Sequence, residues 1–491
     1  MSLKDVISIR DFSRADIEAL IELGLKCKKE KVKKIRSDLK VASIFFENST
    51  RTRISSETAA FNLGGQINGF AGTEGTSVKK GEPLVDTVRM LESYGYEALV
   101  MRHNLAGAAR LCADLLDIPV INGGDGSSGH PTQTLLDLMS MFEVHGKLDG
   151  LKVALIGDLK YGRTVHSLLQ AFELFNVTVY LVSPENLQMP QWRIDDFHKN
   201  TNRKVIIETD LRAILREVDV AYMTRIQRER FPTGVEGESE FKKAFGLYRL
   251  DAEILNSCAK KGLIVLHPLP RDKNNMEILT DVDKTPFAYY FEQAKNGLHM
   301  REAVLMKMLG EGLQGRAKGP NVHAASWKTL PITDGTKKGE KLIYRLDEGT
   351  LIDHLAQGQG MMAYKLLNLD KLTQNEVVVS TNIRSKKQGR KDVLAIHGKE
   401  LASEQLYKLG LLSAEHTINI IKDKQVVQKL KASLPSPLVG LFECKNPLCI
   451  SRSEHKEFAE SRFYIEEQEP LVVRCHYCEQ ILKRGDIELH N

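Results

Sequence analysis

The sequence lacks a run of apolar residues that approaches the ~20 needed to cross a membrane. Its first residues, MSLKDVISIRDFSR, carry charges where a secretory signal would need an apolar core. An excess of one charge is also missing, because 69 Lys and Arg against 64 Asp and Glu leave +5 over 491 residues. This weak excess permits small anionic substrates and indicates neither nucleic-acid nor membrane binding. We therefore expect a cytoplasmic protein.

Cysteine is too scarce for a disulfide framework, because the chain has only seven. Four of them lie near the C-terminus in the pattern Cys444-x4-Cys449, then 25 residues, then Cys475-x2-Cys478. Four thiolates on two such pairs match tetrahedral Zn²⁺, and a small polar segment needs such a staple to fold. Buried free cysteines are the alternative, which the paired spacing disfavours. We expect one structural Zn²⁺ per chain.

The composition is that of an ordinary globular protein, with 42% hydrophobic and 27% charged residues. At ~150 residues per domain, the length suggests three or four domains. The first 300 residues alternate short apolar runs with helical patterns, which predicts parallel sheets covered by helices on both faces. Two α/β domains are expected, at 1–135 and 136–284, and a helix near 285–309 returns to the first.

The remainder of the chain follows a different pattern. Residues 310–340 are rich in glycine and lack periodicity, so they are predicted to be a linker. Residues 341–432 show the order βαββαβ, with a first strand expected at KLIYRLD (341–347), which indicates a ferredoxin-like α+β domain. Residues 433–491 would form a small zinc-binding β domain.

The sharpest short motif is Ser49-Thr50-Arg51-Thr52-Arg53, which follows a predicted buried strand and opens a helix. Free backbone amides and the helix dipole favour an anion at such a position. The hydroxyls add donors and Arg51 adds a planar charged fork, so the motif predicts a phosphate cradle. The alternative is a capped helix start with two solvated arginines, and for an isolated motif the two interpretations are about even.

Two further segments carry groups suited to a carbonyl-bearing ligand. His130 and Gln133 open a helix after the glycine-rich GGDGSSG, and Arg102 ends a predicted strand. A histidine and a glutamine three residues apart can both bind one carbonyl group. The alternatives are a turn histidine satisfied by the backbone and an arginine in a salt bridge at a sheet edge.

The loop Gly157–Thr164 lacks the G-x-G-x-x-G spacing and carries Arg163 where a Walker motif has lysine, which excludes ATP and NAD sites here. Arg225 and Gln227 end another strand, and Arg230 follows. Arginines at strand ends suit a dicarboxylate, because each guanidinium can bind one carboxylate through two hydrogen bonds. Ordinary surface charge is the alternative, and it is strongest for Arg230.

In this order, the motifs resemble those of aspartate carbamoyltransferase catalytic chains over about 5–309: FFENSTRTR, SVKKGE, MRH, HPTQTLLD, GDLKYGRTVHS, YMTRIQRER, HPLPR and DVDKTP. HPLP at 267–270 is similar to the aspartate enzyme, since the ornithine enzyme typically has a cysteine in that loop. Residues 341–491 resemble the family's regulatory chain through GTLIDH, LLNLDKL, GRKD, NPLCIS and CHYCE. Catalytic and regulatory chains would thus be fused in one polypeptide.

The resemblance implies carbamoyl transfer from carbamoyl phosphate to L-aspartate in pyrimidine biosynthesis, without a redox cofactor. The residues matching the carbamoyl phosphate site are Ser49, Thr50, Arg51, Thr52, Ser77, Lys80, Arg102, His130, Gln133, Pro268 and Leu269. Those matching the aspartate site are Lys80, Arg163, Arg225 and Gln227. Thr52, Arg102 and His130 would act on the carbonyl, with His130 as a neutral donor, and Glu47 and Arg230 would hold the closed domains.

The resemblance also implies how chains assemble and respond to effectors. Ser77 and Lys80 would come from a loop inserted into a neighbouring subunit's site, so a homo-oligomer with catalytic trimers is expected. The positions that match the family's nucleotide pocket are Asp353, His354, Asn419 and Lys429. Ala395 stands where regulatory chains typically carry a nucleotide-binding lysine, and Lys424 replaces an aromatic residue. ATP and CTP responses are therefore expected to be weak or absent.

Three other interpretations stay open from the sequence. The acceptor could be another amine such as ornithine, although Arg225 and Leu269 stand where such a site would need an anionic or sulfur-bearing partner. The tail could be an assembly module alone. It could also be a nucleic-acid-binding zinc module, but the acidic stretch EFAESRFYIEEQEP between the cysteine pairs disfavours contact with a phosphate backbone.

Overall fold

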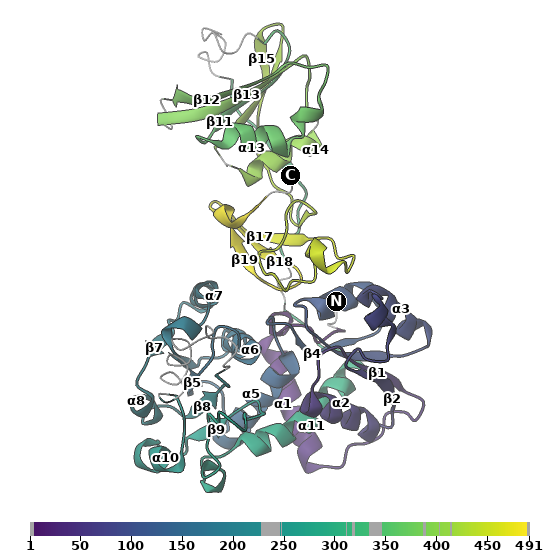
Figure 1. Cartoon of the computed structure of the whole chain (residues 1–491), viewed down its shortest axis with the longest axis vertical. Helices are drawn as coiled ribbons and strands as arrows, with labels where there is room; N and C mark the ends of the chain where they lie inside the picture. Colours follow the sequence, from purple (N-terminus) through teal and green to yellow (C-terminus); the bar gives the residue numbers. More distant parts are fainter. Residues whose placement is uncertain are drawn as a thin grey trace. The chain divides into compact units, whose positions relative to one another are not determined.

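The computed structural model describes nine ranges of the chain: 4–226, 246, 248–310, 312–316, 320–332, 346–385, 389–401, 403–412 and 415–488. The chain forms two compact units (Figure 1). One holds residues 1–318, and the other holds 319–491 apart from 448–450 and 456–458. Within the described ranges, no helix is long and apolar enough to cross a membrane.

The first sheet of the N-terminal unit is parallel and has the strand order β2-β1-β3-β4. Its strands are β1 (Lys40–Phe45), β2 (Gln66–Ala71), β3 (Ala98–His103) and β4 (Val120–Asp125). β1 and β3 are almost wholly buried, as expected for central strands covered on both faces. The helices of this part are α1 (Arg14–Lys29), α2 (Thr50–Asn62), α3 (Leu84–Ser93) and α4 (Ala108–Leu115).

The second sheet of this unit is also parallel and has the order β7-β6-β5-β8-β9. Its strands are β5 (Lys152–Ile156), β6 (Thr178–Val182), β7 (Ile206–Glu208), β8 (Val220–Met223) and β9 (Ile264–Leu266). The helices α6 (Arg163–Ala171), α7 (Gln191–Thr201), α8 (Leu211–Leu215) and α10 (Ala252–Cys258) belong to it. α5 (Pro131–His145) connects the two sheets along the chain, and α11 (Tyr290–Met308) follows the second.

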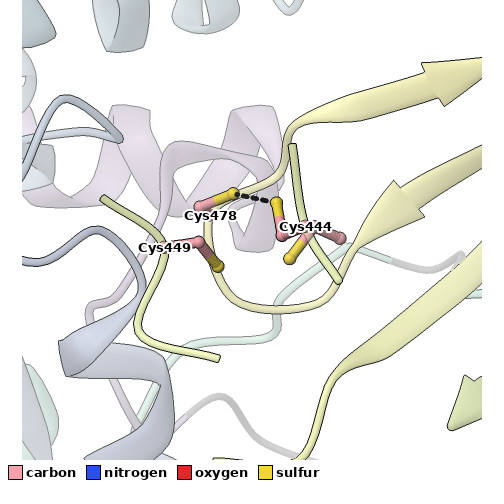
Figure 2. Close-up of side chains that lie close together, drawn as sticks. Cys444, Cys449 and Cys478 are labelled. Atoms are coloured by element: carbon pink, nitrogen blue, oxygen red, sulfur yellow. Dashed lines mark hydrogen bonds between the residues drawn. The ribbon is translucent and has the colours of Figure 1, made fainter. Parts of the chain in front are cut away.

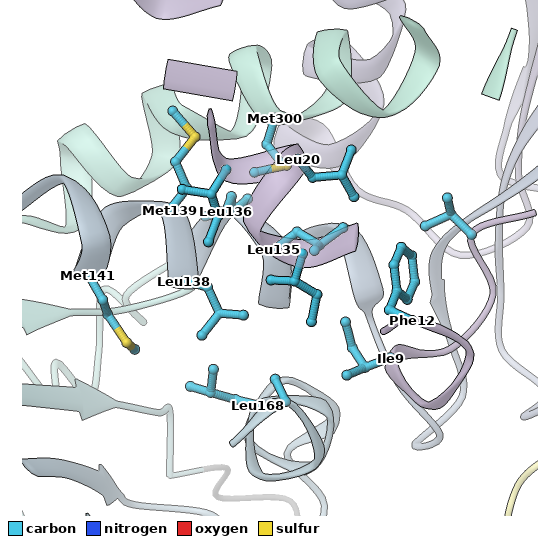
Figure 3. Packing of buried hydrophobic residues seen from close by; sticks show 14 of the residues in the cluster. Ile9, Phe12, Leu20, Leu135, Leu136, Leu138, Met139, Met141, Leu168 and Met300 are labelled. Carbon is cyan, nitrogen blue, oxygen red and sulfur yellow. The ribbon is translucent and has the colours of Figure 1, made fainter. Parts of the chain in front are cut away.

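Helices α1, α5 and α11 share one buried core, although they come from three distant parts of the sequence. α1 begins with a capping box in which the Ser13 and Asp16 side chains and backbone amides bond reciprocally. Leu20 of α1, Met139 of α5 and Met300 of α11 belong to a single apolar cluster (Figure 3). The fit is close, because a Cβ on Gly24 would lie 2.9 Å from the Met139 sulfur. α11, which lies where the returning helix is expected, packs against α1.

The first sheet of the C-terminal unit is antiparallel and has the order β10-β15-β14-β11-β13-β12. Its strands are β10 (Ser326–Thr329), β11 (Gly349–Leu355), β12 (Val377–Ser385), β13 (Gly389–His397), β14 (Thr417–Lys422) and β15 (Gln425–Ser433). α13 (Gln359–Leu366) and the short α14 (Ser403–Leu406) complete the pattern. The four strands β14-β11-β13-β12 have the ferredoxin-like order, and β15 and β10 extend the sheet beside β14.

One expected strand of this domain lies mostly outside the described residues, and one detail of the expected linker differs from the sequence-based expectation. The strand expected at 341–347 lies outside the described residues at 341–345, and Leu346 and Asp347 are not in a strand. β11 pairs on both sides and is buried, as a central strand must be. Within the stretch expected to be a linker, β10 pairs with β15. A strand of four mostly exposed residues leaves no apolar signal in the sequence.

The second sheet of the C-terminal unit is small and antiparallel, with the order β16-β17-β18-β19. Its strands are β16 (Leu438–Val439), β17 (Arg462–Gln468), β18 (Leu471–Cys475) and β19 (Ile481–Lys483). Phe442 and Phe463 stack in its interior with ring centroids 4.4 Å apart. The expected fold class, two parallel-sheet α/β domains followed by a ferredoxin-like domain and a small β domain, is confirmed.

Candidate active site and metal centre

The first parallel sheet brings the predicted phosphate motif and Arg102 to the same edge. β1 and β3 are adjacent, and Phe45 pairs with Arg102. Ser49 follows β1 and is the N-cap of α2 in an extended conformation, with no capping hydrogen bond from its side chain. The strand order changes direction at β1, which is where ligands bind in open parallel sheets. The helix N-terminus therefore faces the same edge as Arg102.

Three of the predicted side chains converge on Gly124, which lies at the end of β4. Gly124 has a φ of +111°, a conformation that side-chain-bearing residues rarely adopt. A Cβ built there would lie 3.3 Å from Arg102 Nη1, 3.4 Å from Arg163 Cζ and 3.4 Å from His130 Cδ2. The approach of the backbone to these groups explains why glycine is needed. Two arginines and a histidine thus surround one small region.

Glu47 joins the arginines that come from different sheets. Its carboxylate accepts hydrogen bonds from Arg102 Nη2 at 3.0 Å and from Arg163 Nη1 at 3.1 Å and Nη2 at 3.2 Å. Arg102 also donates to the carbonyl of Gly123 at 3.4 Å, and Arg163 donates to that of Gly126 at 3.0 Å. Both arginine side chains are largely buried, so a carboxylate between them is favourable. The two arginines thus share one carboxylate.

His130 is buried at the start of α5 and lies 3.3 Å, through Nε2, from Thr52 Oγ1. Thr132 Oγ1 lies 3.4 Å from the other ring nitrogen. Burial lowers the pKa of His130 to about 3, with a further contribution from the charge of Arg301. The imidazole is therefore neutral near neutral pH and can act as a hydrogen-bond partner without carrying a charge.

The second sheet places Arg163 and Arg225 after neighbouring strands. Arg163 opens α6 after β5, and Arg225 follows β8, which pairs with β5. Arg225 is half-buried. The predicted partners Gln227 and Arg230 lie outside the described residues. In the loop after β9, Pro268 precedes Leu269, which has a φ of +49° and donates its N–H to His267 Nδ1 at 2.8 Å.

Ser77 and Lys80 are not part of this cluster in the single chain. They lie in a short 3₁₀ helix (Ser77–Lys80), and both are exposed. Neither side chain makes a hydrogen bond or an ion pair with another described residue. The neighbouring Lys79 pairs with Glu74 instead. One chain alone therefore does not deliver these two side chains to the region around Gly124.

The four C-terminal cysteines form a compact and fully buried cluster. Each offers a sulfur atom, and the four sulfurs lie within 4.8 Å of one another. Cys444 Sγ lies 3.5 Å from Cys478 Sγ, well beyond a disulfide bond (Figure 2). Four thiolates at the corners of a tetrahedral Zn²⁺ site would be about 3.8 Å apart. The donor set and its dimensions thus fit a four-sulfur metal site.

Four family models match successive parts of the chain. The aspartate/ornithine carbamoyltransferase carbamoyl-P binding domain matches 4–143, and the Asp/Orn binding domain matches 149–308. The allosteric and metal binding domains of the aspartate carbamoyltransferase regulatory chain match 341–433 and 437–488.

Among individual proteins, the aspartate carbamoyltransferase catalytic subunit of Chromobacterium violaceum is 51% identical over 311 residues, 63% of this chain and 99% of the relative. The chain belongs to the aspartate carbamoyltransferase family. The catalytic subunit of Thermococcus kodakarensis is 48% identical, covering 62% of this chain and 97% of that protein. The family predicted from the sequence motifs is confirmed, with its catalytic and regulatory parts in one polypeptide.

Solved structures of aspartate transcarbamoylases agree with this assignment. The catalytic subunit of the M. jannaschii enzyme is 40% identical and has a TM-score of 0.57, over 63% of this chain and 99% of that one. The Trypanosoma cruzi enzyme in complex with carbamoyl phosphate is 38% identical with a TM-score of 0.57, over 64% and 96%. The likeness extends over the catalytic part of the family fold.

The residues predicted to line a nucleotide pocket lie on one region of the regulatory sheet. Asn419 of β14 pairs with Leu351 and with Lys429, and Leu351 pairs with Ala395. These four residues therefore form one row on one face. Asn419 donates to the Leu351 carbonyl at 3.3 Å. Its Oδ1 atom is buried without a partner among the described residues.

Asp353 and His354 end the same region of β11. Although burial raises its pKa, hydrogen bonds from His354 and Lys391 lower the pKa of Asp353 to about 2. Asp353 is therefore ionised and already neutralised by protein groups. Lys424 lies in the turn before β15 and forms an exposed ion pair with Asp347 at 3.4 Å.

Several residues beside the family site were not singled out from the sequence. They are Thr132, Asp137, Tyr222, Gln293 and Arg301, all of them buried. Burial raises the pKa of Asp137 to about 7, against the opposing effect of hydrogen bonds from Gln293, Tyr222 and Gln133. The only available signal was Asp137 in HPTQTLLD, four residues after Gln133 and thus on the same face of a helix.

Proposed function

We propose that the chain transfers the carbamoyl group of carbamoyl phosphate to the amine of L-aspartate, giving N-carbamoyl-L-aspartate and phosphate. The proposal rests on the convergence of Arg102, Arg163 and His130 on Gly124 in a member of this enzyme family. The chain spans nearly all of the catalytic subunits to which it is similar. Carbamoyl phosphate and L-aspartate are both anions, which suits a site built on arginines.

The chemistry follows from charge. The neutral amine of aspartate attacks the carbamoyl carbon, a C–N bond forms, and negative charge develops on the carbonyl oxygen. Arg102, Thr52 and the neutral His130 would donate to that oxygen from preorganised positions. The C–O bond to phosphate then breaks, and the departing phosphate takes the amine proton. Binding the two substrates side by side supplies the remaining acceleration.

The anion-binding groups have distinct places. Ser49, Thr50 and Arg51 at the start of α2 would hold the phosphate, where backbone amides point toward the ligand. Arg163 and Arg225, at the ends of neighbouring strands, would hold the aspartate carboxylates, with Gln227 and Lys80 as further contacts. Glu47, which bonds Arg102 and Arg163, and Arg230 would help to keep the domains closed.

An acceptor panel tests this assignment. With carbamoyl phosphate present, aspartate should give saturable phosphate release, and ornithine should give no more than buffer, because two arginines repel its ammonium group. Phosphate is measured together with the carbamoylated product by mass spectrometry. Saturable turnover of ornithine, with aspartate at the buffer rate, would reassign the acceptor.

We further propose that active sites are shared within a catalytic trimer, since the exposed Lys80 makes no contact with the Gly124 region of its own chain. Lys80→Ala and His130→Ala should each be inactive alone. After dissociation and reassembly of a mixture, some sites draw an intact Lys80 and an intact His130 from different chains. Activity should return to a fraction of the wild-type rate, measured by product formation.

The control for this experiment is each variant dissociated and reassembled by itself, which should remain inactive. Native mass spectrometry of differently tagged chains establishes that mixed oligomers formed. Mixed oligomers without activity would mean that each site is built by one chain.

The metal in the four-cysteine cluster is proposed to be Zn²⁺, one per chain, with a structural role. Four protein thiolates complete tetrahedral coordination and leave no position for a substrate. The bound ion would hold the knuckles around Cys444–Cys449 and Cys475–Cys478 together. These thiolates are deprotonated when the metal is bound.

The nucleotide response of the tail is proposed to be weak or absent, with assembly as its main role. Ala395 offers no positive donor in the row that contains Asn419 and Lys429, and Lys391 is engaged by Asp353. We expect saturating ATP or CTP to change the rate less than about twofold at subsaturating aspartate, since losing a charged hydrogen bond costs ~1.5–3 kcal/mol. Initial rates across a nucleotide titration measure this.

The matched control is the same titration on Ala395→Lys, which returns the positive donor. A several-fold saturable change in the wild-type rate would contradict the expectation.

A further inference from the structure

Asp137 is a fully buried carboxylate one helical turn after Gln133 on α5. Its Oδ1 accepts hydrogen bonds from Gln133 Nε2 at 2.8 Å and from Gln293 Nε2 of α11 at 2.6 Å. Its Oδ2 accepts one from the Tyr222 hydroxyl at 2.8 Å. The two oxygens of Asp137 thus accept from three side chains, one each on α5, α11 and β8.

The hydrogen bonds continue from Asp137 to the loop after β9. Gln293 Oε1 accepts from the backbone N–H of His267 at 2.8 Å. His267 Nδ1 in turn accepts from the backbone N–H of Leu269 at 2.8 Å. An unbroken chain therefore runs from Gln133 through Asp137, Gln293 and His267 to Leu269, across two helices and a loop.

This chain fixes which polar atoms remain for a ligand. The bond from Gln133 Nε2 to Asp137 fixes the orientation of the Gln133 amide, so Oε1 is held as an acceptor while the second Nε2 hydrogen stays unused by Asp137. The N–H of Leu269 is likewise occupied by His267, which leaves the carbonyl groups of that loop. Both ends of the chain consequently offer acceptors, and acceptors recognise an N–H donor.

We propose that Asp137 is a positioning residue that makes the site select an amine on the transferred group. This proposal rests on the proposed function and on the resemblance of Gln133, Pro268 and Leu269 to residues of the family's carbamoyl phosphate site. Without Asp137, the Gln133 amide would be free to turn over and present Nε2, and the loop would lose its tie through Gln293. A site whose hydrogen-bond acceptors are fixed discriminates strongly against an acyl phosphate that has a methyl group in place of the amine.

The test compares carbamoyl phosphate with acetyl phosphate, which carries a methyl group in place of the amine. Asp137→Leu should raise the KM for carbamoyl phosphate roughly tenfold. The inhibition constant of acetyl phosphate as a competitor of carbamoyl phosphate should stay within about twofold of the wild-type value. Acetyl phosphate has no amine, so it has no such contact to lose. Asp137→Asn should retain most of the wild-type preference, because its Oδ1 can still accept from both glutamines.

Two further variants separate positioning from general damage. Gln293→Met removes the link to His267 without changing Asp137. Like Asp137→Leu, it should weaken the affinity for carbamoyl phosphate relative to the affinity for acetyl phosphate. Ser140→Ala is the matched control, since Ser140 is a buried polar residue of the same helix that contacts Asn296 and lies outside the chain. It should leave the ratio unchanged.

If Asp137→Leu and Gln293→Met lose affinity for carbamoyl phosphate and for acetyl phosphate equally, the proposal is overturned, because that result would reveal a structural role alone. An inactive wild-type protein would instead overturn the proposed function. If Asp137→Leu does not fold, the ratio in Gln293→Met against Ser140→Ala decides by itself.

Discussion

Arg102→Ala should lower kcat by ~10²–10³, the loss measured when one donor to a developing oxyanion is removed. Arg102 contacts Glu47 and the Gly123 carbonyl, and its guanidinium lies beside His130 and Arg163 across Gly124. Alanine removes a positive charge from a largely buried site, where that charge acts most strongly. Steady-state rates at saturating carbamoyl phosphate and aspartate measure the effect on kcat.

Arg14→Ala is the matched control for the loss of an ion-paired arginine. Arg14 bonds Asp149 at 2.7 Å and Glu18 at 2.9 Å, but its side chain is 46% exposed. Exposed pairs of this kind contribute about 0–1 kcal/mol to stability, so kcat should not change. If Arg102→Ala keeps both its thermal stability and its kcat, Arg102 is not part of the catalytic machinery.

Cys475→Ser should release the metal and unfold the small C-terminal β domain. The four sulfurs are all buried in this domain, and zinc binding supplies ~10–16 kcal/mol of apparent folding free energy to such modules. The zinc content should fall from one per chain to nearly none, measured by elemental analysis. Limited proteolysis should then cut within residues 437–488, while residues 1–308 stay resistant and active.

Cys258→Ser is the control, because Cys258 is buried but lies in α10, away from the cluster. It should keep one zinc per chain and a resistant tail. Much less than one zinc in undamaged wild-type protein, or a Cys475→Ser tail that stays resistant, would contradict a structural metal site. Loss of carbamoyl transfer together with the tail would show that the catalytic unit depends on it.

Local patterns were enough to predict where several candidate residues lie. Ser49 and Arg102 stand at the ends of apolar runs, and parallel strands bring such ends to one edge of a sheet. The cysteine spacing likewise predicts two knuckles whose sulfurs meet. In each case the decisive information lies within a few residues, where periodicity and turn chemistry leave a clear signal.

Contacts between distant segments could not be predicted in the same way. Asp137 and Gln293 are 156 residues apart, and each looks like an ordinary polar residue of a helix until the fold joins them. Strand β10 is similar, because its pairing with β15 depends on backbone groups and not on an apolar pattern. The hydrogen bond between Glu47 and Arg163 connects segments that follow strands of two different sheets, so the local sequence around either residue does not predict it.

The packing of α11 against α1 has a consequence for how the chain is made. The apolar face of α1, with Ile17, Leu20 and Ile21, is covered by a helix that ends only at Met308. At ~5–20 residues per second, a ribosome needs roughly 15–55 s to reach that point after finishing α1. For this interval the nascent N-terminal segment carries an uncovered apolar surface, which is a substrate for chaperones. Slower translation beyond residue 150 should lengthen its exposure and lower the soluble yield.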